Sequence, residues 1–267
     1  MPDLHSLVDR IHYDGQREYT VKRGNVAYLD FTPLTRPANM PRAQRLIALV
    51  IVIVAVLIGF AMVNAFVLSP MREAATTEQR IADNLAREAS INTIPEMAGL
   101  INLDNDAIKA KFAEAGYTIY DASSFDDSND MVLYKLPSDM TVGDAAALYQ
   151  QGVGSLNAEQ ASKLLNGSWH FAVDRINGTS MVVRYADFST GDPQIAGQNA
   201  MNKENLGSAT TTESGVDDSG NTYSMGTLDA DGTACTWKVS ALPLDDIYSI
   251  SGLPTNACYV GVRITAQ

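Results

Sequence analysis

The longest apolar stretch of the chain runs from Leu46 to Leu68, where 23 successive residues carry no charged side chain. A helix rises about 1.5 Å per residue, so this segment is long enough to cross a hydrocarbon core of roughly 30 Å. The apolar part of a cleaved signal peptide is shorter and starts near the N-terminus. We therefore predict one transmembrane helix over residues 46–68 that stays in place as a signal anchor.

The pattern changes directly after this stretch, at Ser69-Pro70. Serine is a favourable N-cap and proline suits the first helical position, so either a new helix or a kinked continuation should follow. Apolar residues recur at helical spacing as far as Ser90, but the stripe is thin. We predict a short juxtamembrane helical stalk over residues 69–90.

From residue 91 onward, short helical segments alternate with β-prone runs. Four residues suited to helix N-caps predict helix starts: Asp104, Thr141, Asn157 and Asp192. The β-prone runs cover residues 117–120, 131–136, 168–175, 180–188, 222–228, 235–242 and 258–265. The polar stretch over residues 208–221 predicts a loop.

Two turn signals, Asn177-Gly178 and Asp231-Gly232, separate consecutive β-prone runs and predict hairpins. Strands joined by tight turns pair antiparallel. We expect residues 91–267 to form one α+β domain with an antiparallel sheet and several helices. Division into two sub-blocks, 91–190 and 191–267, is an alternative.

The distribution of charge predicts an orientation. Residues 1–45 carry a formal +2, with Arg42 and Arg45 directly against the apolar run, whereas residues 69–267 hold 12 basic and 26 acidic side chains. Positive charges beside a span favour the cytoplasmic side. We expect a largely flexible cytoplasmic tail over residues 1–45, too short to bury a core, and an extracytoplasmic C-terminal domain at the cytoplasmic membrane.

Small residues recur at a spacing of four within the apolar run. The two pairs are Ala55 with Gly59, and Ala61 with Ala65. Small side chains at this spacing allow two helix backbones to approach closely in a membrane. The lipid bilayer is thus the first predicted partner, and self-association through this helix face is a second.

Both cysteines of the chain, Cys235 and Cys258, lie in β-prone runs of the part predicted to be extracytoplasmic. A cysteine pair outside the cytoplasm can stay oxidised. We predict a disulfide between them that would stabilise the fold by roughly 3 kcal/mol in the chain-entropy model. Two buried free thiols, or a metal pair, are the alternatives.

Catalytic signatures are missing from the sequence. His170 is the only histidine after residue 68 and reads as an ordinary strand residue. A Ser–His–Asp arrangement can be written around it, but there is no Gly-x-Ser-x-Gly elbow, His-Glu-x-x-His motif or glycine-rich phosphate loop. We predict no catalytic residue, no cofactor and no metal ligand, so an enzyme is the weaker expectation.

Three acidic clusters could supply part of a calcium shell, which needs 6–8 oxygen ligands. They comprise Asp104, Asn105 and Asp106; Asp126, Asp127, Asn129 and Asp130; and Asp229, Asp231 and Gly232. The first cluster also fits a helix cap, and the third also fits a hairpin turn. The formal −14 of residues 69–267 disfavours nucleic acid as a partner and is compatible with basic proteins or cations.

The ending GLPTNACYVGV resembles the C-terminal segment of type IV pilins, which also join an N-terminal apolar helix to an α+β head with a late disulfide. The apolar run here opens RAQRLIALVIV, without the Glu that pilins carry near its start. The resemblance covers about ten residues. It implies a pilin-like subunit only as a lesser alternative, and no family is assigned.

Together these features predict a single-pass, membrane-anchored extracytoplasmic protein. Its expected role is non-catalytic binding or scaffolding in a bacterial cell-envelope assembly, with envelope proteins as partners. An envelope hydrolase acting on wall polymer or peptide is the alternative. A sensor or a transport accessory subunit is a lesser one.

Overall fold

The computed structural model describes residues 11–13, 19–21, 42–125, 129–176 and 178–267. Residues 1–74 and 75–267 form two compact units. In the first unit, β1 (Ile11–Tyr13) pairs antiparallel with β2 (Tyr19–Val21). The rest of the tail predicted to be flexible, up to residue 41, lies outside the described residues.

A helix of three consecutive parts contains the apolar run: α3 (Arg42–Val63), a π-helical turn (Asn64–Leu68) and α4 (Ser69–Leu85). Pro70 has no N–H to donate, so the regular ladder cannot continue through it. The Ser69 N–H instead bonds the carbonyl of Asn64, five residues back. Of the two alternatives for Ser69-Pro70, the continued helix is therefore the one observed.

Among the described residues, one helix is long and apolar enough to cross a membrane by length and composition. The described side chains of its apolar part, from Ile51 onward, are not buried within the protein. Exposure of an apolar surface of this length is unfavourable in water and favourable in hydrocarbon. The finding is consistent with a single-pass membrane protein, as the sequence predicts.

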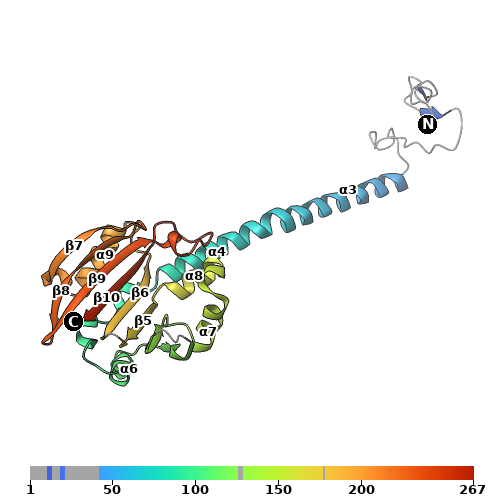
Figure 1. The fold of residues 1–267 in the computed structure, drawn as a ribbon. Coiled ribbons are helices and arrows are strands. Elements are labelled where there is room, and N and C mark those ends of the chain that lie inside the picture. The colour runs from blue at the N-terminus through green and yellow to red at the C-terminus, as the bar shows by residue number, and fades with distance from the viewer. Residues whose placement is uncertain (1–10, 14–18, 22–41, 126–128, 177) are drawn as a thin grey trace, which may run out of the picture. The chain divides into compact units, whose positions relative to one another are not determined.

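The second unit contains an eight-stranded antiparallel sheet in the order β3-β4-β5-β6-β10-β9-β8-β7 (Figure 1). Its strands are β3 (Ile119–Asp121), β4 (Met131–Lys135), β5 (Trp169–Asp174), β6 (Ser180–Asp187), β7 (Thr210–Val216), β8 (Thr222–Ala230), β9 (Thr233–Pro243) and β10 (Cys258–Ala266). The C-terminal strand β10 lies between β6 and β9, so both predicted sub-blocks contribute strands to one sheet. The predicted α+β class with an antiparallel sheet is confirmed.

Three helices cover one face of the sheet, which is called the inner face below. They are α5 (Ser90–Thr93), α6 (Asn105–Glu114) and α9 (Pro193–Lys203). Phe112 of α6 meets Trp169 and Phe171 of β5 edge to face, with ring centroids 5.2 and 5.3 Å apart. Helix α9 lies against β8, β9 and β10 (Figure 1). These contacts form the main hydrophobic core.

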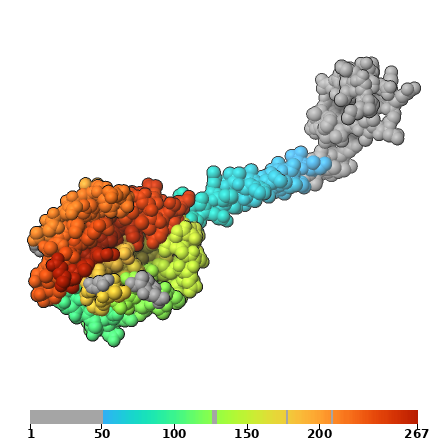
Figure 2. Space-filling model, in the orientation of Figure 1, coloured from blue at the N-terminus to red at the C-terminus, as the bar shows by residue number. Residues whose placement is uncertain are grey.

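The opposite face, called the outer face, is covered only in part. Helices α7 (Val142–Gln151) and α8 (Ala158–Leu165), together with residues 244–257, pack a second core against β4, β6 and the start of β10. In Figure 2 the red and orange-red atoms of β9 and β10 lie at the surface of the face toward the viewer. The outer face of these strands is therefore accessible.

The end of the predicted stalk is attached to this unit. Asn84 donates to the hydroxyl of Ser162 at 3.0 Å, and Arg80 pairs with Glu159 at 2.8 Å. Asn166 returns a hydrogen bond to the Asn84 carbonyl at 2.8 Å. The last two turns of α4 are thereby tied to α8 by side-chain contacts.

Local signals in the sequence proved informative. The side chains of Asp104, Thr141, Asn157 and Asp192 all cap helices as predicted. The Asp231-Gly232 turn joins β8 to β9, with positive φ at both residues. The loop predicted over residues 208–221 is wrong in its first half, because β7 occupies Thr210–Val216.

The predicted disulfide is also wrong: Cys235 and Cys258 are free and buried. In the register of β9 with β10, Cys235 lies opposite Ala266 and Cys258 lies opposite Pro243. Eight residues of strand separate the two positions, a distance of about 27 Å at roughly 3.4 Å per residue. A disulfide requires Cα atoms within about 7 Å, so the two thiols cannot bond within one chain.

Candidate functional site

Strand β7 forms one edge of the sheet and is exposed along its whole length. Directly after the last residue pair between β7 and β8, the Asp217 N–H donates a hydrogen bond to the carbonyl of Asn221 at 2.9 Å. Hydrogen-bonded and non-hydrogen-bonded pairs alternate in an antiparallel ladder. This alternation places the N–H and C=O groups of Ser214 and Val216 on the side away from β8, where they can pair with a further strand.

The position of β7 depends on a close backbone contact with β8. The register shifts between Thr211 and Glu213, which marks a bulge. A Cβ on Gly226 would lie 1.9 Å from the Thr210 carbonyl oxygen and 2.8 Å from the Trp237 ring. Glycine at position 226 thus allows the start of β7 to approach β8 and bend over the inner face.

A groove of about 630 Å³ lies between β7 and helix α9 on the inner face. Its lining combines a few apolar side chains with hydroxyl and amide groups. These residues are Asp192, Pro193, Gln194, Ile195, Gly197, Gln198, Met201, Ser214, Gly215, Val216, Thr222, Tyr223, Ser224 and Val239. A mixed lining of this kind suits a ligand that has both backbone amides and apolar side chains.

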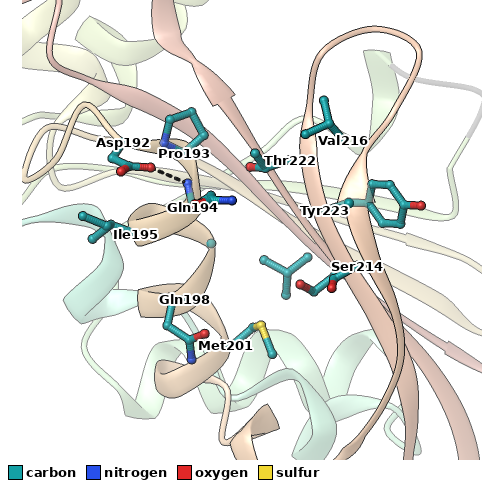
Figure 3. A pocket seen from close by; sticks show the side chains of 14 residues that line it. Asp192, Pro193, Gln194, Ile195, Gln198, Met201, Ser214, Val216, Thr222 and Tyr223 are labelled. Atoms are coloured by element: carbon teal, nitrogen blue, oxygen red, sulfur yellow. Dashed lines mark hydrogen bonds between the residues drawn. The ribbon is translucent and has the colours of Figure 1, made fainter.

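Figure 3 shows how the two walls are arranged. Met201 from α9 and Ser214 from β7 point into the space between the two elements, whereas Tyr223 points away from it. The Asp192 carboxylate accepts a hydrogen bond from the Gln194 N–H at 2.8 Å and fixes the start of α9. Val216 is 61% exposed at the rim of the groove. The groove is therefore open to an extended segment lying alongside β7.

Acidic residues lie in the β7–β8 turn and at the start of α9. Hydrogen bonds from Asn221 hold the pKa of the Asp217 carboxyl below its usual range. Asp218 is adjacent in the same turn, and Asp192 lies at the start of α9. Opposite charges attract at this range, so cationic side chains of a ligand are favoured there.

The residues predicted from the sequence for membrane association belong to the first unit. Arg42 and Arg45 are in the first turn of α3. Ala55, Gly59 and Ala61 follow along α3, and Ala65 is in the π-helical turn. A Cβ on Gly59 would meet nothing within 4 Å, so that position is open to a neighbouring helix.

His170 lies on the outer face, half-buried, with its Nδ1 3.4 Å from an Arg184 guanidinium nitrogen. Its strand neighbours Trp169 and Phe171 point into the core, as the alternation predicts. Ser168 and Ala172, which share this face with His170, are both buried. The Ser168 hydroxyl donates to the Leu165 carbonyl at 3.2 Å.

The acidic clusters serve local structure where they are described. Asp104 accepts from the Ala107 N–H at 2.8 Å, and Asp229 from the Gly232 N–H at 2.8 Å. Asp130 accepts from the Arg175 N–H at 2.5 Å. Residues 126–128 lie outside the described part. Within that part, no group of three or more Asp, Glu, His or Cys side chains is arranged to hold a metal ion.

One carboxylate has a strongly shifted pKa. Burial raises the pKa of Glu204 to about 7, although its Oε2 accepts a hydrogen bond from the Met97 N–H at 2.9 Å. Its Oε1 is buried with no hydrogen-bond partner among the described residues. The residue is 2% exposed, and it is among the residues that line a cavity of about 580 Å³.

Sequence reasoning missed β7 because the strand has no buried face. Its signal was compositional only, in the β-branched residues Thr210, Thr211, Thr212 and Val216 ahead of a glycine turn. Without alternation of apolar and polar residues, the segment resembles a polar loop. The free edge of a sheet is the kind of surface that such patterns do not reveal.

No protein-family model, curated protein or solved structure matches the chain.

Proposed function

We propose that this chain is a single-pass membrane protein, with its N-terminus cytoplasmic, whose extracytoplasmic unit is a non-catalytic binding component of a bacterial cell-envelope assembly. The apolar helix and the two arginines at its start support the anchoring and the orientation. On this proposal α4 begins as a juxtamembrane helix. Self-association through Ala55 and Gly59 is compatible with it.

The groove beside β7 receives an extended segment of a partner protein, which adds a ninth strand to the sheet. The observation that carries this proposal is the exposed edge: β7 presents a free row of backbone groups above a groove of about 630 Å³. Main-chain hydrogen bonds supply affinity in this binding mode, and alternate side chains enter the groove and supply specificity.

The partner segment carries basic residues. Asp192 lines the groove, Asp217 and Asp218 follow the lining residue Val216 in the β7–β8 turn, and the unit as a whole is acidic. Electrostatic complementarity of this kind speeds encounter and suppresses acidic competitors. The binding should therefore weaken as salt is added.

A proline substitution tests this mode because the N–H of Ser214 points away from β8. Ser214→Pro removes one outward donor without removing a bond to β8, and edge strands tolerate proline on the solvent side. The control Ser214→Ala keeps the N–H. The probe is a fluorescent octapeptide of alternating Val and Lys, titrated into the full-length chain in detergent micelles.

We expect the wild type and Ser214→Ala to bind this peptide with similar affinity and Ser214→Pro to bind at least tenfold more weakly. The corresponding Val-Glu octapeptide should bind more weakly than the Val-Lys peptide to all three proteins. Equal affinity of all three for the Val-Lys peptide would reject edge pairing. Equal affinity for the two peptides would reject the acidic rim as a determinant.

A further inference from the structure

The accessible part of the outer face carries three cations on adjacent strands. Arg263 of β10 lies directly opposite Lys238 of β9, and Arg184 of β6 lies opposite Gly261, two residues before Arg263. Directly opposed residues have Cβ atoms about 5 Å apart, and diagonal neighbours are about 7–8 Å apart. Three positive charges therefore recur at intervals of about 5–8 Å across the sheet.

This arrangement is unfavourable without a counter-charge. Like charges directly opposite each other destabilise a sheet. Within the described residues none of the three cations forms an ion pair, although the charge of Lys238 contributes to the lowered pKa of Asp217. Lys238 lies 5.0 Å from the ring centroid of Tyr223, whose hydroxyl bonds the Glu213 carboxylate on β7. In contrast, Arg80, Arg87 and Lys109 elsewhere in the unit all pair with acids.

A cavity of about 390 Å³ adjoins Arg184 on the same face. Five tyrosines are among its lining residues: Tyr134, Tyr149, Tyr185, Tyr248 and Tyr259. The rings of Tyr134 and Tyr149 are 4.3 Å apart between centroids, and those of Tyr248 and Tyr259 are 5.9 Å apart. Burial raises the pKa of Tyr248, and a hydrogen bond with Tyr259 and the charge of Arg184 oppose that rise.

Hydroxyl groups surround the cations as well. Thr236, Ser240 and Thr265 share the outer face with Lys238 and Arg263 and are half-buried. Hydroxyls both donate and accept hydrogen bonds, and aromatic faces attract polarised C–H groups. Both features match a sugar ring. Arginine in addition offers a planar fork that fits a carboxylate.

We propose that the outer face of the sheet binds an acidic polysaccharide. One sugar ring enters the tyrosine cavity, and carboxylates of successive residues meet Arg184, Arg263 and Lys238. The site is on the face opposite to the β7 groove and does not depend on it. The formal negative charge of the unit opposes this binding only weakly, because charges beyond about 8 Å are screened at physiological salt.

The test uses the full-length chain in detergent micelles and an octamer of galacturonic acid as the probe, measured by calorimetry. The variants are Arg263→Gln combined with Lys238→Gln, Arg184→Gln alone, and Arg263→Lys, which keeps the charge. Lys111→Gln is the matched control, because Lys111 is an exposed cation on α6, away from the outer face.

We expect at least tenfold weaker binding for the double variant and for Arg184→Gln. Affinity within twofold of the wild type is expected for Lys111→Gln and Ser214→Pro, and Arg263→Lys, which keeps the charge but loses the planar fork, should bind with an affinity between those of the wild type and the double variant. A neutral galactose octamer should not bind. Thermal melting of each variant shows whether it is folded, and Arg184→Gln keeps the test decisive if the double variant melts early.

Three results would overturn the proposal. The first is equal affinity of the wild type and the double variant. The second is binding of octaglutamate or polyphosphate as tightly as the galacturonic acid octamer. That result would show that the site recognises negative charge and not a sugar. The third is a protein that does not bind the galacturonic acid octamer but self-associates as its concentration rises, with the double variant staying monomeric. That result would assign the cations to a contact between two copies of the chain.

Discussion

The carbonyl oxygen of Thr210 occupies the space in which a side chain at Gly226 would have to lie. A Cβ there would be 1.9 Å from that oxygen. Gly226→Ala should therefore push the start of β7 away from β8, at a cost of about 1–3 kcal/mol as in other overpacked sites. Thermal melting measures the loss, and amide exchange should show faster exchange in β8 where it faces β7.

The matched control for this change is Gly154→Ala. A Cβ added to Gly154 would meet no atom within 4 Å, and the φ of this residue is not positive, so alanine fits there without strain. Its melting temperature should stay close to that of the wild type. A Gly226→Ala protein as stable as this control would contradict the backbone contact that positions β7.

The two cysteine thiols should be unreactive in the folded protein. Burial raises the pKa of Cys258 to about 11 and raises that of Cys235 as well, so neither forms the reactive thiolate at neutral pH. Ellman's reagent should titrate no thiol in the native protein and two after denaturation without reductant. If no thiol reacts in denaturant, the cysteines form disulfides, and the free thiols described here are contradicted.

Glu204 should make stability fall as pH rises. Its pKa in the folded protein is about 7, against an ordinary value of 4.5. The unfolded chain therefore loses its proton first, and stability decreases between about pH 4.5 and pH 7, by about 3 kcal/mol in total. Glu204→Gln removes this dependence, so the variant should melt higher than the wild type at pH 8 but not at pH 4.5.

Melting temperatures at these two pH values measure the effect, and Glu114→Gln is the control, because Glu114 is exposed on α6. That variant should keep the full wild-type pH dependence. If Glu204→Gln and Glu114→Gln melt alike at pH 8, the buried carboxylate does not control stability in this range.

The local elements of this fold could be predicted from the sequence, but their assembly could not. Caps such as Asn157 with Gln160 satisfy helix ends within three residues, and Asp231-Gly232 closes its hairpin with two positive φ angles. These are local effects, so short patterns carry them. The insertion of β10 between β6 and β9 is a pairing of distant segments, which no local pattern specifies.

The cysteine error and the missed edge strand share this origin. Cys235 and Cys258 lie in neighbouring strands, yet the register places them at opposite ends of the pair. Register depends on turn geometry and on the fit of two buried faces, which the spacing of two cysteines does not report. The cations Arg184 and Arg263 likewise meet only after β6 and β10 pair.

Membrane orientation should follow Arg42 and Arg45. A protease added to intact spheroplasts should remove an epitope placed after Gln267 and spare one placed before Met1, since positive flanks are retained in the cytoplasm. Replacing both arginines by Glu should increase the fraction with the opposite orientation. Protection of the C-terminal epitope in the wild type would contradict the proposed topology.

The most direct test of edge docking is photocrosslinking in intact cells from a photoreactive residue at Val216. The matched position is Ile247, which is 44% exposed and does not line the groove. We predict a crosslinked partner from position 216 that disappears with Ser214→Pro, persists with Ser214→Ala and is missing at position 247. The same crosslinks from positions 216 and 247, or a crosslink from position 216 that persists in the Ser214→Pro variant, would contradict a partner strand at β7.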